Sequence, residues 1–250
     1  MRLRDIYSLD VYIIHLPSHV ERRRHIESLM KRIGFPSFEF VTPETIPENE
    51  RNSRVNRPTR SLYETNIALM ERLSEAESTA PYVLIFEDDV VPTVPAEDVR
   101  KVIERTMAVL PDDWDMLYLE YCCETCLMAK TVAPGLIQSR NPSCTAAIMY
   151  RRERLAKILP LIKRYRREKQ IDHAYKHLIQ QGALKAYSAY PAVFRQDTNT
   201  FASTLDTFYI KRFLFGYSSC DTKMWVSIGA TLAATAGMLW FLRAKRLKTT

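Results

Sequence analysis

The chain has 250 residues, of which 46% are hydrophobic and 26% charged, a balance that excludes a disordered or fibrous protein. Its net charge of +7 is local, because residues 151–169 hold nine Lys or Arg against two Glu and residues 243–250 add four more basic side chains. A nucleic-acid-binding protein normally spreads its positive charge over the binding face, so this distribution argues against nucleic acid as a partner.

Apolar runs and helical periodicity predict the elements of the first half of the chain. Residues 10–16 (DVYIIHL) are expected to form a buried strand, followed by a helix that begins at a capping box made by Ser18 and Glu21. A short strand over residues 38–41 and a loop rich in Pro and Arg come next. A second capping box, Ser61 with Glu64, predicts the start of the following helix.

The second half of the chain continues this alternation. Strands are predicted over residues 82–86, 115–121, 143–150 and 185–190, and helices after Pro95, over residues 155–165 with a bend near Pro160, and over residues 171–181. Strands that alternate with helices predict an α/β fold with a mostly parallel, doubly wound sheet flanked by helices.

Three adjacent carboxylates, Glu87, Asp88 and Asp89, follow the apolar run at residues 82–86. An unpaired charge costs several kcal/mol to bury, so either the strand ends here in solvent or a positive group lies among the acids. Ligands of open α/β sheets bind beyond the carboxyl ends of the strands. The cluster therefore suits a divalent cation that bridges to substrate phosphates, and the alternative is a solvated turn.

The five cysteines are odd in number, and three of them are crowded into CCETC at residues 122–126, which is not a disulfide framework. Cys123 and Cys126 have the spacing that begins a zinc site, but no second pair follows at finger or ribbon spacing. We therefore expect reduced, partly buried thiols. Together with the absence of a recognisable signal peptide, this favours a reducing compartment for the folded part.

Seven stretches in a fixed order carry a resemblance to a known family. They are VYIIHLPSHVERR (11–23), SLYETNIALMERL (61–73), YVLIFEDDV (82–90), DWDMLYLE (113–120), CTAAIMYRRERLAKIL (144–159), QIDHAYKHL (170–178) and YPAVFRQD (190–197). In this set the chain resembles glycosyltransferase family 25, the lipopolysaccharide-biosynthesis and procollagen galactosyltransferase group. The resemblance implies a Rossmann-like GT-A fold, a nucleotide-sugar donor that is UDP-linked, a Mn²⁺ or Mg²⁺ ion and inversion at the anomeric carbon.

The resemblance also implies roles for the acids and for the first strand. Asp89 corresponds to a direct metal ligand, and Asp88 and Glu87 bind the metal, its water or the donor ribose. His15 stands at the base and ribose position, where the family usually has Asn.

Other residues match the family on either side of this region. Arg22 and Arg23 match arginines that face the donor phosphates, and the alternative for both is a solvated helix face. Asp172 matches a family Asp and is expected to be the base that takes the proton of the acceptor hydroxyl, the alternative being a solvated carboxylate at a helix N-terminus. Gln196 matches a position near the acceptor, and Asn66 replaces a family His whose role is not transferred.

A histidine pair on the same predicted helix has a second interpretation. His173 and His177 stand four residues apart, which is a spacing that can bind a metal ion. We favour surface or packing roles for both.

The segment MWVSIGATLAATAGMLWFL (224–242) contains no charge over 19 residues. As a helix it would span about 28 Å, close to the ~30 Å hydrocarbon core of a bilayer, and a buried Ala-rich helix is the alternative. Gly229, Ala233 and Gly237 form a small-residue face that suits a homodimer. Residues 151–169 are expected to form a solvated amphipathic helix, or alternatively to contact anionic headgroups or a charged acceptor.

The predicted organisation is a glycosyltransferase domain (1–205), a juxtamembrane linker (206–223), a transmembrane helix (224–242) and a basic tail (243–250). Because no signal peptide is visible, the catalytic domain is expected to face the cytosol. The sequence thus predicts a membrane-anchored, metal-dependent hexosyltransferase that acts on a glycan, glycolipid or glycoprotein acceptor. Its alternatives are a metal-dependent nucleotidyltransferase and a membrane-anchored binding protein whose transferase site has decayed.

Overall fold

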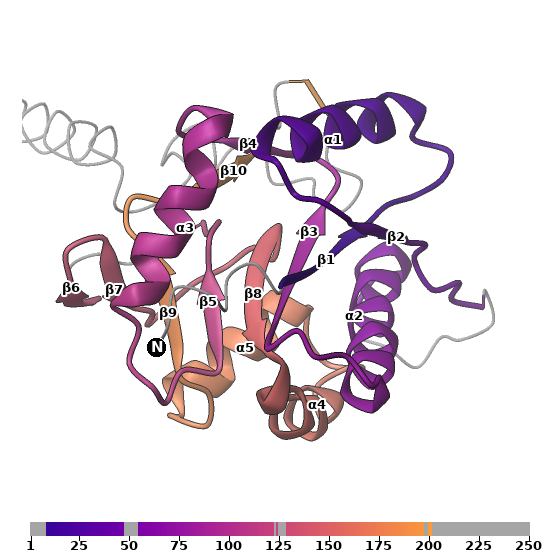
Figure 1. Ribbon diagram of the computed structural model, residues 1–250. Coiled ribbons are helices and arrows are strands. Elements are labelled where there is room, and N and C mark those ends of the chain that lie inside the picture. The colour runs from indigo at the N-terminus through magenta and orange to yellow at the C-terminus, as the bar shows by residue number, and fades with distance from the viewer. Residues whose placement is uncertain (1–8, 48–54, 123, 125–128, 198–199, 202–250) are drawn as a thin grey trace, which may run out of the picture.

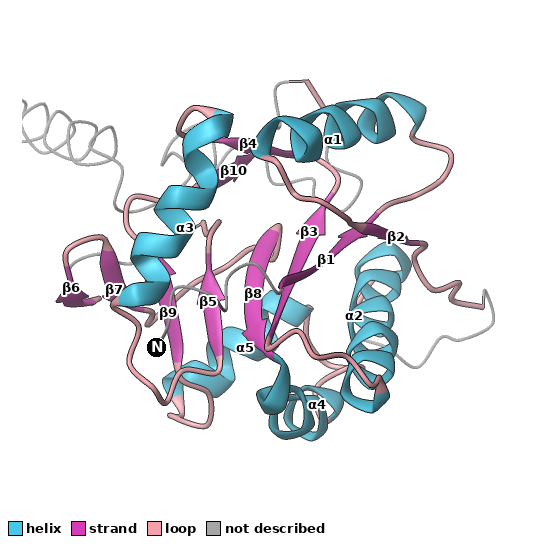
Figure 2. Cartoon of the chain, in the orientation of Figure 1, coloured by secondary structure: helices cyan, strands magenta, loops and turns pink. Residues whose placement is uncertain are grey.

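An eight-stranded sheet runs through the middle of the molecule, with helices on both of its faces (Figures 1 and 2). The computed structural model describes residues 9–47, 55–122, 124, 129–197 and 200–201. The strands, in sheet order, are β2 (Glu39–Val41), β1 (Leu9–Ile14), β3 (Tyr82–Glu87), β8 (Ala147–Arg151), β5 (Met116–Tyr118), β9 (Ala186–Ala189), β7 (Leu136–Gln138) and β6 (Lys130–Ala133). A separate two-stranded sheet joins β4 (Val90–Pro92) to β10 (Phe194–Gln196).

The strand directions confirm an α/β fold with a mostly parallel sheet, in which β8 and β7 run against the other strands. β1 pairs in parallel with β2 and β3, and β5 pairs in parallel with β9. β8 lies between β3 and β5 and is antiparallel to both, and β7 is antiparallel to β9. A parallel neighbour requires a long crossover connection, usually a helix, and the described residues between β5 and β8 contain none. The chain therefore enters β8 from the end of the sheet at which β3 finishes.

The helices cover the two faces of the sheet according to the alternation of side chains along the strands. Helices α1 (Val20–Ile33) and α3 (Val99–Ala108) pack on one face, which receives Leu84 and Phe86 of β3. Helices α2 (Arg57–Glu75), α4 (Leu155–Lys163) and α5 (Ile171–Gln180) pack on the other face, which receives Val83 and Ile85. Both faces of β3 are thus covered, so its apolar run is central to the core.

Both predicted capping boxes are wrong, because each helix starts at a different residue. Helix α1 begins at Val20 with His19 as its N-cap and without a side-chain capping bond, since Ser18 lies in the preceding turn. Helix α2 begins one turn before the predicted position, where the side chain of Asn56 accepts a 3.0 Å hydrogen bond from the Thr59 amide. Asn is among the strongest N-cap residues, and the proline that follows within the first turn favours the same start.

A disulfide joins Cys122 to Cys144, with their Cα atoms 5.7 Å apart. The expectation of reduced thiols is therefore wrong for these two residues. The backbone of Cys122 forms two hydrogen bonds with that of Ser143, of 3.0 and 2.9 Å, and these bring the two segments together. The sequence does not reveal this long-range pairing, because the cysteines are 22 residues apart. Cys123, Cys126 and Cys220 lie outside the described residues.

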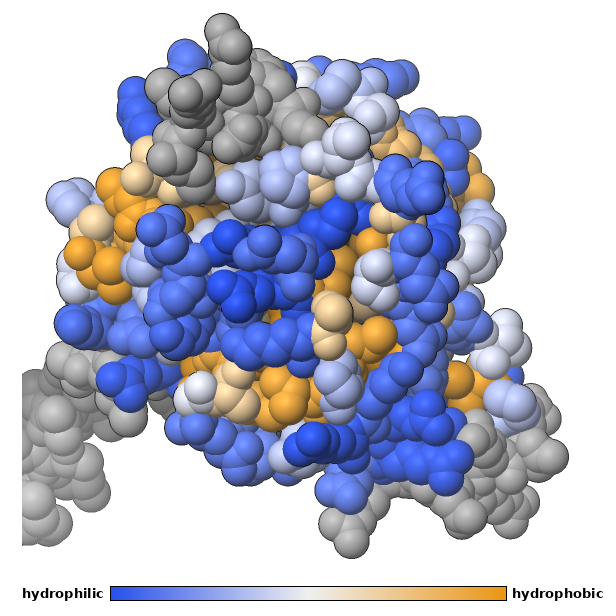
Figure 3. Space-filling view, turned by 60° about the horizontal axis from the view of Figure 1, so that its bottom comes forward, coloured by the Kyte–Doolittle hydropathy of each residue, from blue (hydrophilic) through white to orange (hydrophobic). Residues whose placement is uncertain are grey.

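Within the basic segment over residues 151–169, Leu155–Lys163 form the amphipathic helix α4, which is shorter than predicted. Leu155, Ile158 and Ile162 of α4 are buried against α2 and α5. Several of its basic side chains pair with acids of neighbouring elements, including Arg152 with Asp10 and Lys163 with Glu71. The face of the molecule around α4 is mostly hydrophilic (Figure 3).

Within the part of the chain that the structure describes, no helix is both long and apolar enough to cross a bilayer. The predicted linker, transmembrane helix and basic tail (206–250) lie outside the described residues. The predicted transferase domain holds all the strands and helices given above.

Candidate active site

The three predicted acids lie at the edge of the sheet where β1 and β3 end. These strands are parallel and in register, with Ile14 opposite Glu87, so His15 and Asp88 follow at the same edge. The side chains of Asp88 and Asp89 are only 7% and 8% exposed. A solvated turn, the alternative interpretation of the acids, is therefore wrong.

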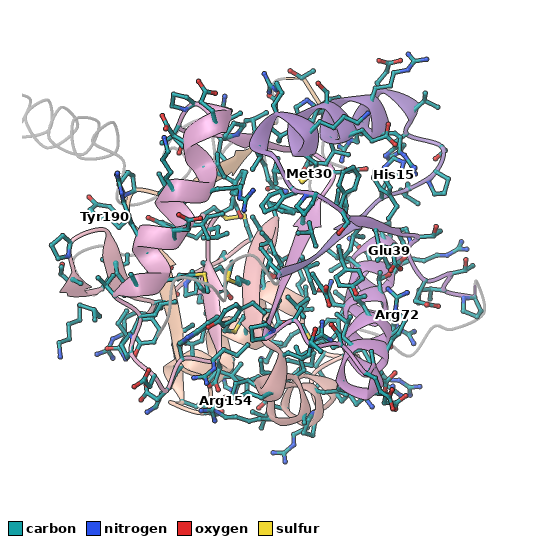
Figure 4. All side chains as sticks on the ribbon, viewed as in Figure 1. His15, Met30, Glu39, Arg72, Arg154 and Tyr190 are labelled. Atoms are coloured by element: carbon teal, nitrogen blue, oxygen red, sulfur yellow. A yellow bond between two sulfur atoms is a disulfide. The ribbon has the colours of Figure 1, made fainter. Side chains whose placement is uncertain are left out.

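A histidine and an arginine lie against the buried acids. Nδ1 of His15 lies 2.7 Å from Oδ2 of Asp88, and because an ionised carboxylate only accepts, Nδ1 carries the proton. Nη1 of Arg22 donates to Oδ1 of Asp88 at 2.7 Å and to Oδ2 of Asp89 at 3.3 Å. Figure 4 shows His15 beside the strand ends on the α1 side of the sheet. The predicted residues His15, Arg22, Asp88 and Asp89 thus form one contact network.

Glu87 belongs to the same cluster but has different partners. The Thr145 hydroxyl donates to its Oε1 at 2.8 Å, and Nε2 of Gln196 donates to its Oε2 at 3.4 Å. Desolvation of the carboxylate and the charge of Asp89 raise the pKa of Glu87 to about 8, with smaller contributions from Asp88 and Asp172. The buried carboxylates therefore repel one another, and the Arg22 guanidinium does not fully offset this.

Asp89 is also buried without full compensation of its negative charge. Desolvation raises its pKa, although the charge of Arg22 acts in the opposite direction. Its Oδ1 atom is buried and has no hydrogen-bond partner among the described residues. A buried carboxylate oxygen without a partner is destabilising, and a cation would satisfy it.

A cavity of about 480 Å³ lies against the cluster, between the ends of β1 and β3 and the start of α2. Its volume falls within the range of small-molecule and cofactor sites. Apolar and polar groups both line it, including Ile14, Leu16, Ile46, Leu62, His15, Arg22, Glu44, Arg57, Glu87 and Asp88. This composition suits a ligand with an apolar ring system and a negatively charged group.

Helix α2 holds the loop that forms one wall of this cavity. The Thr65 hydroxyl accepts a 2.8 Å hydrogen bond from the Glu44 amide, and the Ser61 hydroxyl donates to the Glu44 carbonyl at 2.5 Å. Asn66 is buried and donates to the Leu62 carbonyl within the helix. Thr65 and Asn66 therefore have structural roles here that nothing in the sequence indicated.

Asp172 lies in the first turn of α5, where it is partly buried. Its Oδ2 accepts from the Cys144 amide at 3.4 Å, and its Oδ1 accepts from the His173 amide at 2.7 Å. Cys144 contacts Asp172 and the next residue, Thr145, contacts Glu87, so Asp172 lies near the acids. Asp172, Glu87 and Gln196 are thus brought to one region by α5, β3 and β10, although they are far apart in sequence.

The structure does not bring every candidate into this cluster. Arg23 donates to Glu27 at 2.6 Å, and its guanidinium lies 3.5 Å from the ring centroid of Phe40, so its phosphate-binding role stays a prediction. His177 packs edge-on against Tyr165, in agreement with a packing role, and His173 is exposed.

No group of three or more His, Cys, Asp or Glu among the described residues is arranged to hold a metal ion. Mg²⁺ and similar ions are often bound by only one or two carboxylates together with waters and substrate phosphates. Asp89 fits that mode, because its buried Oδ1 has no partner in the described part of the chain, whereas both oxygens of Asp88 already contact His15 or Arg22.

No protein-family model and no curated protein matches the chain. Among solved structures it is similar to a glycosyltransferase involved in glycosylation of the major capsid of PBCV-1, with 13% identity, a TM-score of 0.49, and coverage of 77% of this chain and 94% of that one. It is also similar to the glycosyltransferase GlyE of Streptococcus pneumoniae (8% identity, TM-score 0.44, 90% and 63% coverage). A third similar structure is apo UDP-glucose pyrophosphorylase (8% identity, TM-score 0.40, 78% and 77% coverage).

Proposed function

We propose that this chain is a glycosyltransferase that moves a sugar, such as galactose, from a UDP-linked donor to a hydroxyl group of a glycan, glycolipid or glycoprotein. The observation that carries the proposal is the 480 Å³ cavity that opens onto a buried acidic cluster beyond the ends of β1 and β3. Such edges of α/β sheets are where nucleotides bind.

In this proposal the cavity binds one part of the donor and the residues around the acidic cluster bind the other. The base and ribose occupy the cavity, where Ile14 and Leu62 offer apolar contact and His15 and Glu44 offer polar groups. Arg22 lines the cavity and contacts the acids, so it lies where it can pair with the donor diphosphate. A guanidinium suits this task because it binds phosphate oxygens in a fixed fork geometry.

Asp89 is the residue that would hold a divalent cation, Mn²⁺ or Mg²⁺, since its Oδ1 is buried without a partner among the described residues. When bound, such a cation neutralises charge that develops on a diphosphate leaving group. Asp88 keeps Arg22 and His15 in place through its two oxygens. Glu87 is held beside these residues by Thr145 and Gln196, and because its pKa is raised to about 8 it would add negative charge to the cluster only once a cation favours its ionised form.

Inversion requires a base that removes the proton of the acceptor hydroxyl while the hydroxyl attacks the sugar. Asp172 has this role in the proposal, because it lies partly exposed near Glu87 and is oriented by the Cys144 amide.

The test is incubation of the purified protein with Mn²⁺ and a panel of nucleotide sugars, with UDP-galactose first, followed by measurement of released nucleotides. Release of a nucleoside diphosphate supports sugar transfer, whereas pyrophosphate release would indicate a nucleotidyltransferase instead. Absence of both products, with donor still bound, would favour the binding protein. The Asp98→Asn variant is a matched control for substitutions of the acidic cluster, because the Asp98 carboxylate lies on the surface in a salt bridge with Lys101.

We also propose that residues 224–242 anchor the domain beside a membrane-borne acceptor, which would raise the effective concentration of both partners. The expectation of a cytosolic orientation rested on reduced thiols and on the absence of a recognisable signal peptide. The first argument no longer holds, because Cys122 and Cys144 are bonded and disulfides persist mainly in oxidising compartments. Protease treatment of sealed vesicles distinguishes the orientations, because a cytosolic domain is digested before detergent is added and a lumenal one only afterwards.

A further inference from the structure

Residues 143–146 run between the two sides of the candidate active site. The Thr145 hydroxyl donates to Glu87 at 2.8 Å, and the Ala146 carbonyl accepts from the Glu87 amide at 2.9 Å. On the other side, the Cys144 amide donates to Asp172. This short segment therefore contacts both the acidic cluster and the proposed base.

The backbone of this segment has an uncommon conformation at its centre. Cys144 has a φ of +68° and is the one non-glycine residue with positive φ among those that the structure describes. Left-handed backbone is unfavourable for a residue with a Cβ, so it persists only where the surrounding structure imposes it. The Asp172 bond depends on this conformation, because the backbone at Cys144 sets the direction of its amide.

The disulfide is the covalent restraint on that conformation. It fixes Cys144 to Cys122 in the segment after β5, where the flanking Ser143 is also paired by two backbone hydrogen bonds. Cys144 is partly exposed, whereas Cys122 is buried. Neither cysteine lines the donor cavity, which is formed mainly by the ends of β1 and β3, the β2–α2 loop and the start of α2.

We propose that the Cys122–Cys144 disulfide positions Asp172 relative to the acidic cluster, so that sugar transfer requires the oxidised form. The inference rests on the proposed function. A dithiol reductant delivers two electrons and two protons, so that the S–S bond becomes two thiols and the reductant becomes a disulfide. Cys144 then loses its restraint, so the Asp172 carboxylate keeps the bond from the His173 amide but loses the fixed donor to its Oδ2 atom.

This arrangement predicts that reduction affects transfer and not donor binding. A misplacement of about 1 Å can lower a rate by about 100-fold, so transfer to the acceptor should fall at least about 10-fold on reduction. The KM for the donor should change less than about 2-fold, because the cavity is lined by other elements.

The experiment compares oxidised and dithiothreitol-treated full-length protein with the Cys122→Ser and Cys144→Ser variants and their double variant. The proposal expects slow transfer in all reduced or substituted forms, recovery when reduced wild type is reoxidised, and no effect of dithiothreitol on the double variant. Equal transfer rates in the oxidised and reduced wild type would overturn it. So would peptide mapping that pairs Cys144 with a cysteine other than Cys122.

Hydrogen exchange supplies a readout that does not need activity. Exchange of the Cys144 amide should rise at least about 10-fold on reduction, while amides of β3 stay protected, and unchanged exchange at Cys144 would contradict the proposal. This measurement also separates the two hypotheses. If the oxidised protein releases no nucleoside diphosphate from any donor, the proposed function fails, whereas the restraint on Cys144 is still decided by exchange. A variant that does not fold leaves the wild-type comparison decisive.

Discussion

Replacement of Arg22 by Met should lower the stability of the domain strongly. The Arg22 side chain is 11% exposed and contacts Asp88 and Asp89, whose side chains are 7% and 8% exposed. Met has a similar length without the charge, so the variant leaves two buried carboxylates without the guanidinium that contacts both. Removal of one partner from a buried ion pair typically costs about 3–5 kcal/mol, because the remaining charge is left uncompensated.

The measurement is thermal unfolding followed by circular dichroism in the presence of a chelator. For a domain of 150–250 residues, each kcal/mol shifts Tm by about 2–4 °C, so Arg22→Met should unfold about 6–20 °C below wild type. The matched control is Arg24→Met on the same helix, where the arginine pairs with Glu21 and both side chains are more than 70% exposed. An exposed pair contributes about 0–1 kcal/mol, so this control should stay within about 4 °C of wild type.

A divalent cation adds a second test of the same variant. If the two carboxylates are destabilising because they lack positive charge, Mn²⁺ should raise the Tm of Arg22→Met more than that of wild type. Equal Tm values for Arg22→Met and Arg24→Met in chelator would refute the view that Arg22 neutralises these acids.

Three further outcomes are expected. Asp89→Asn should fold normally but lose at least about 100-fold in Mn²⁺-dependent diphosphate release, since a lost ligand costs several kcal/mol of transition-state stabilisation, and full activity of the folded variant would contradict this. Asp172→Asn should slow transfer far more than it weakens donor binding, as measured by separate titration and turnover assays, and collapse of donor affinity would instead make Asp172 a binding residue. A chain that ends at Asp221 should be soluble and active on a soluble acceptor, yet slower on a membrane-borne one, and an equal loss on both acceptors would argue against tethering.

The sequence predicted the elements that have strong hydrophobic patterns. The buried strands β1 and β3 and the helices α1, α2 and α5 were found within a few residues of their observed bounds, because their apolar positions recur with a clear period. Their exact starts were missed where a local cap decided them, as at Asn56. The β6–β7 hairpin was also missed, since β6 is largely exposed and carries no alternating pattern.

The candidate site was predicted only in part, because its contacts are long-range. The position of Glu87, Asp88 and Asp89 at a strand end followed from the sequence, as did the choice of Arg22 and Asp172 on the basis of a family resemblance. Thr145 was not foreseen as a partner of Glu87, since its strand was expected to be one more ordinary core element. The disulfide was missed for the same reason, because pairing of residues 22 positions apart depends on the reversal of β8.

The role of Arg22 gives the acidic cluster a physical explanation that does not depend on metal alone. Three carboxylates after a buried strand require positive charge, and Arg22 supplies part of it from α1, while His15 contacts Asp88 from the end of β1. Incomplete compensation of the negative charge is visible as the raised pKa values of Glu87 and Asp89, and Oδ1 of Asp89 has no hydrogen-bond partner among the described residues. The Arg22 guanidinium therefore stabilises the folded domain, while the uncompensated charge would favour binding of a divalent cation. Because a donor diphosphate would compete with Asp88 for Arg22, the strength of the Arg22–Asp88 contact should also limit how tightly the donor binds.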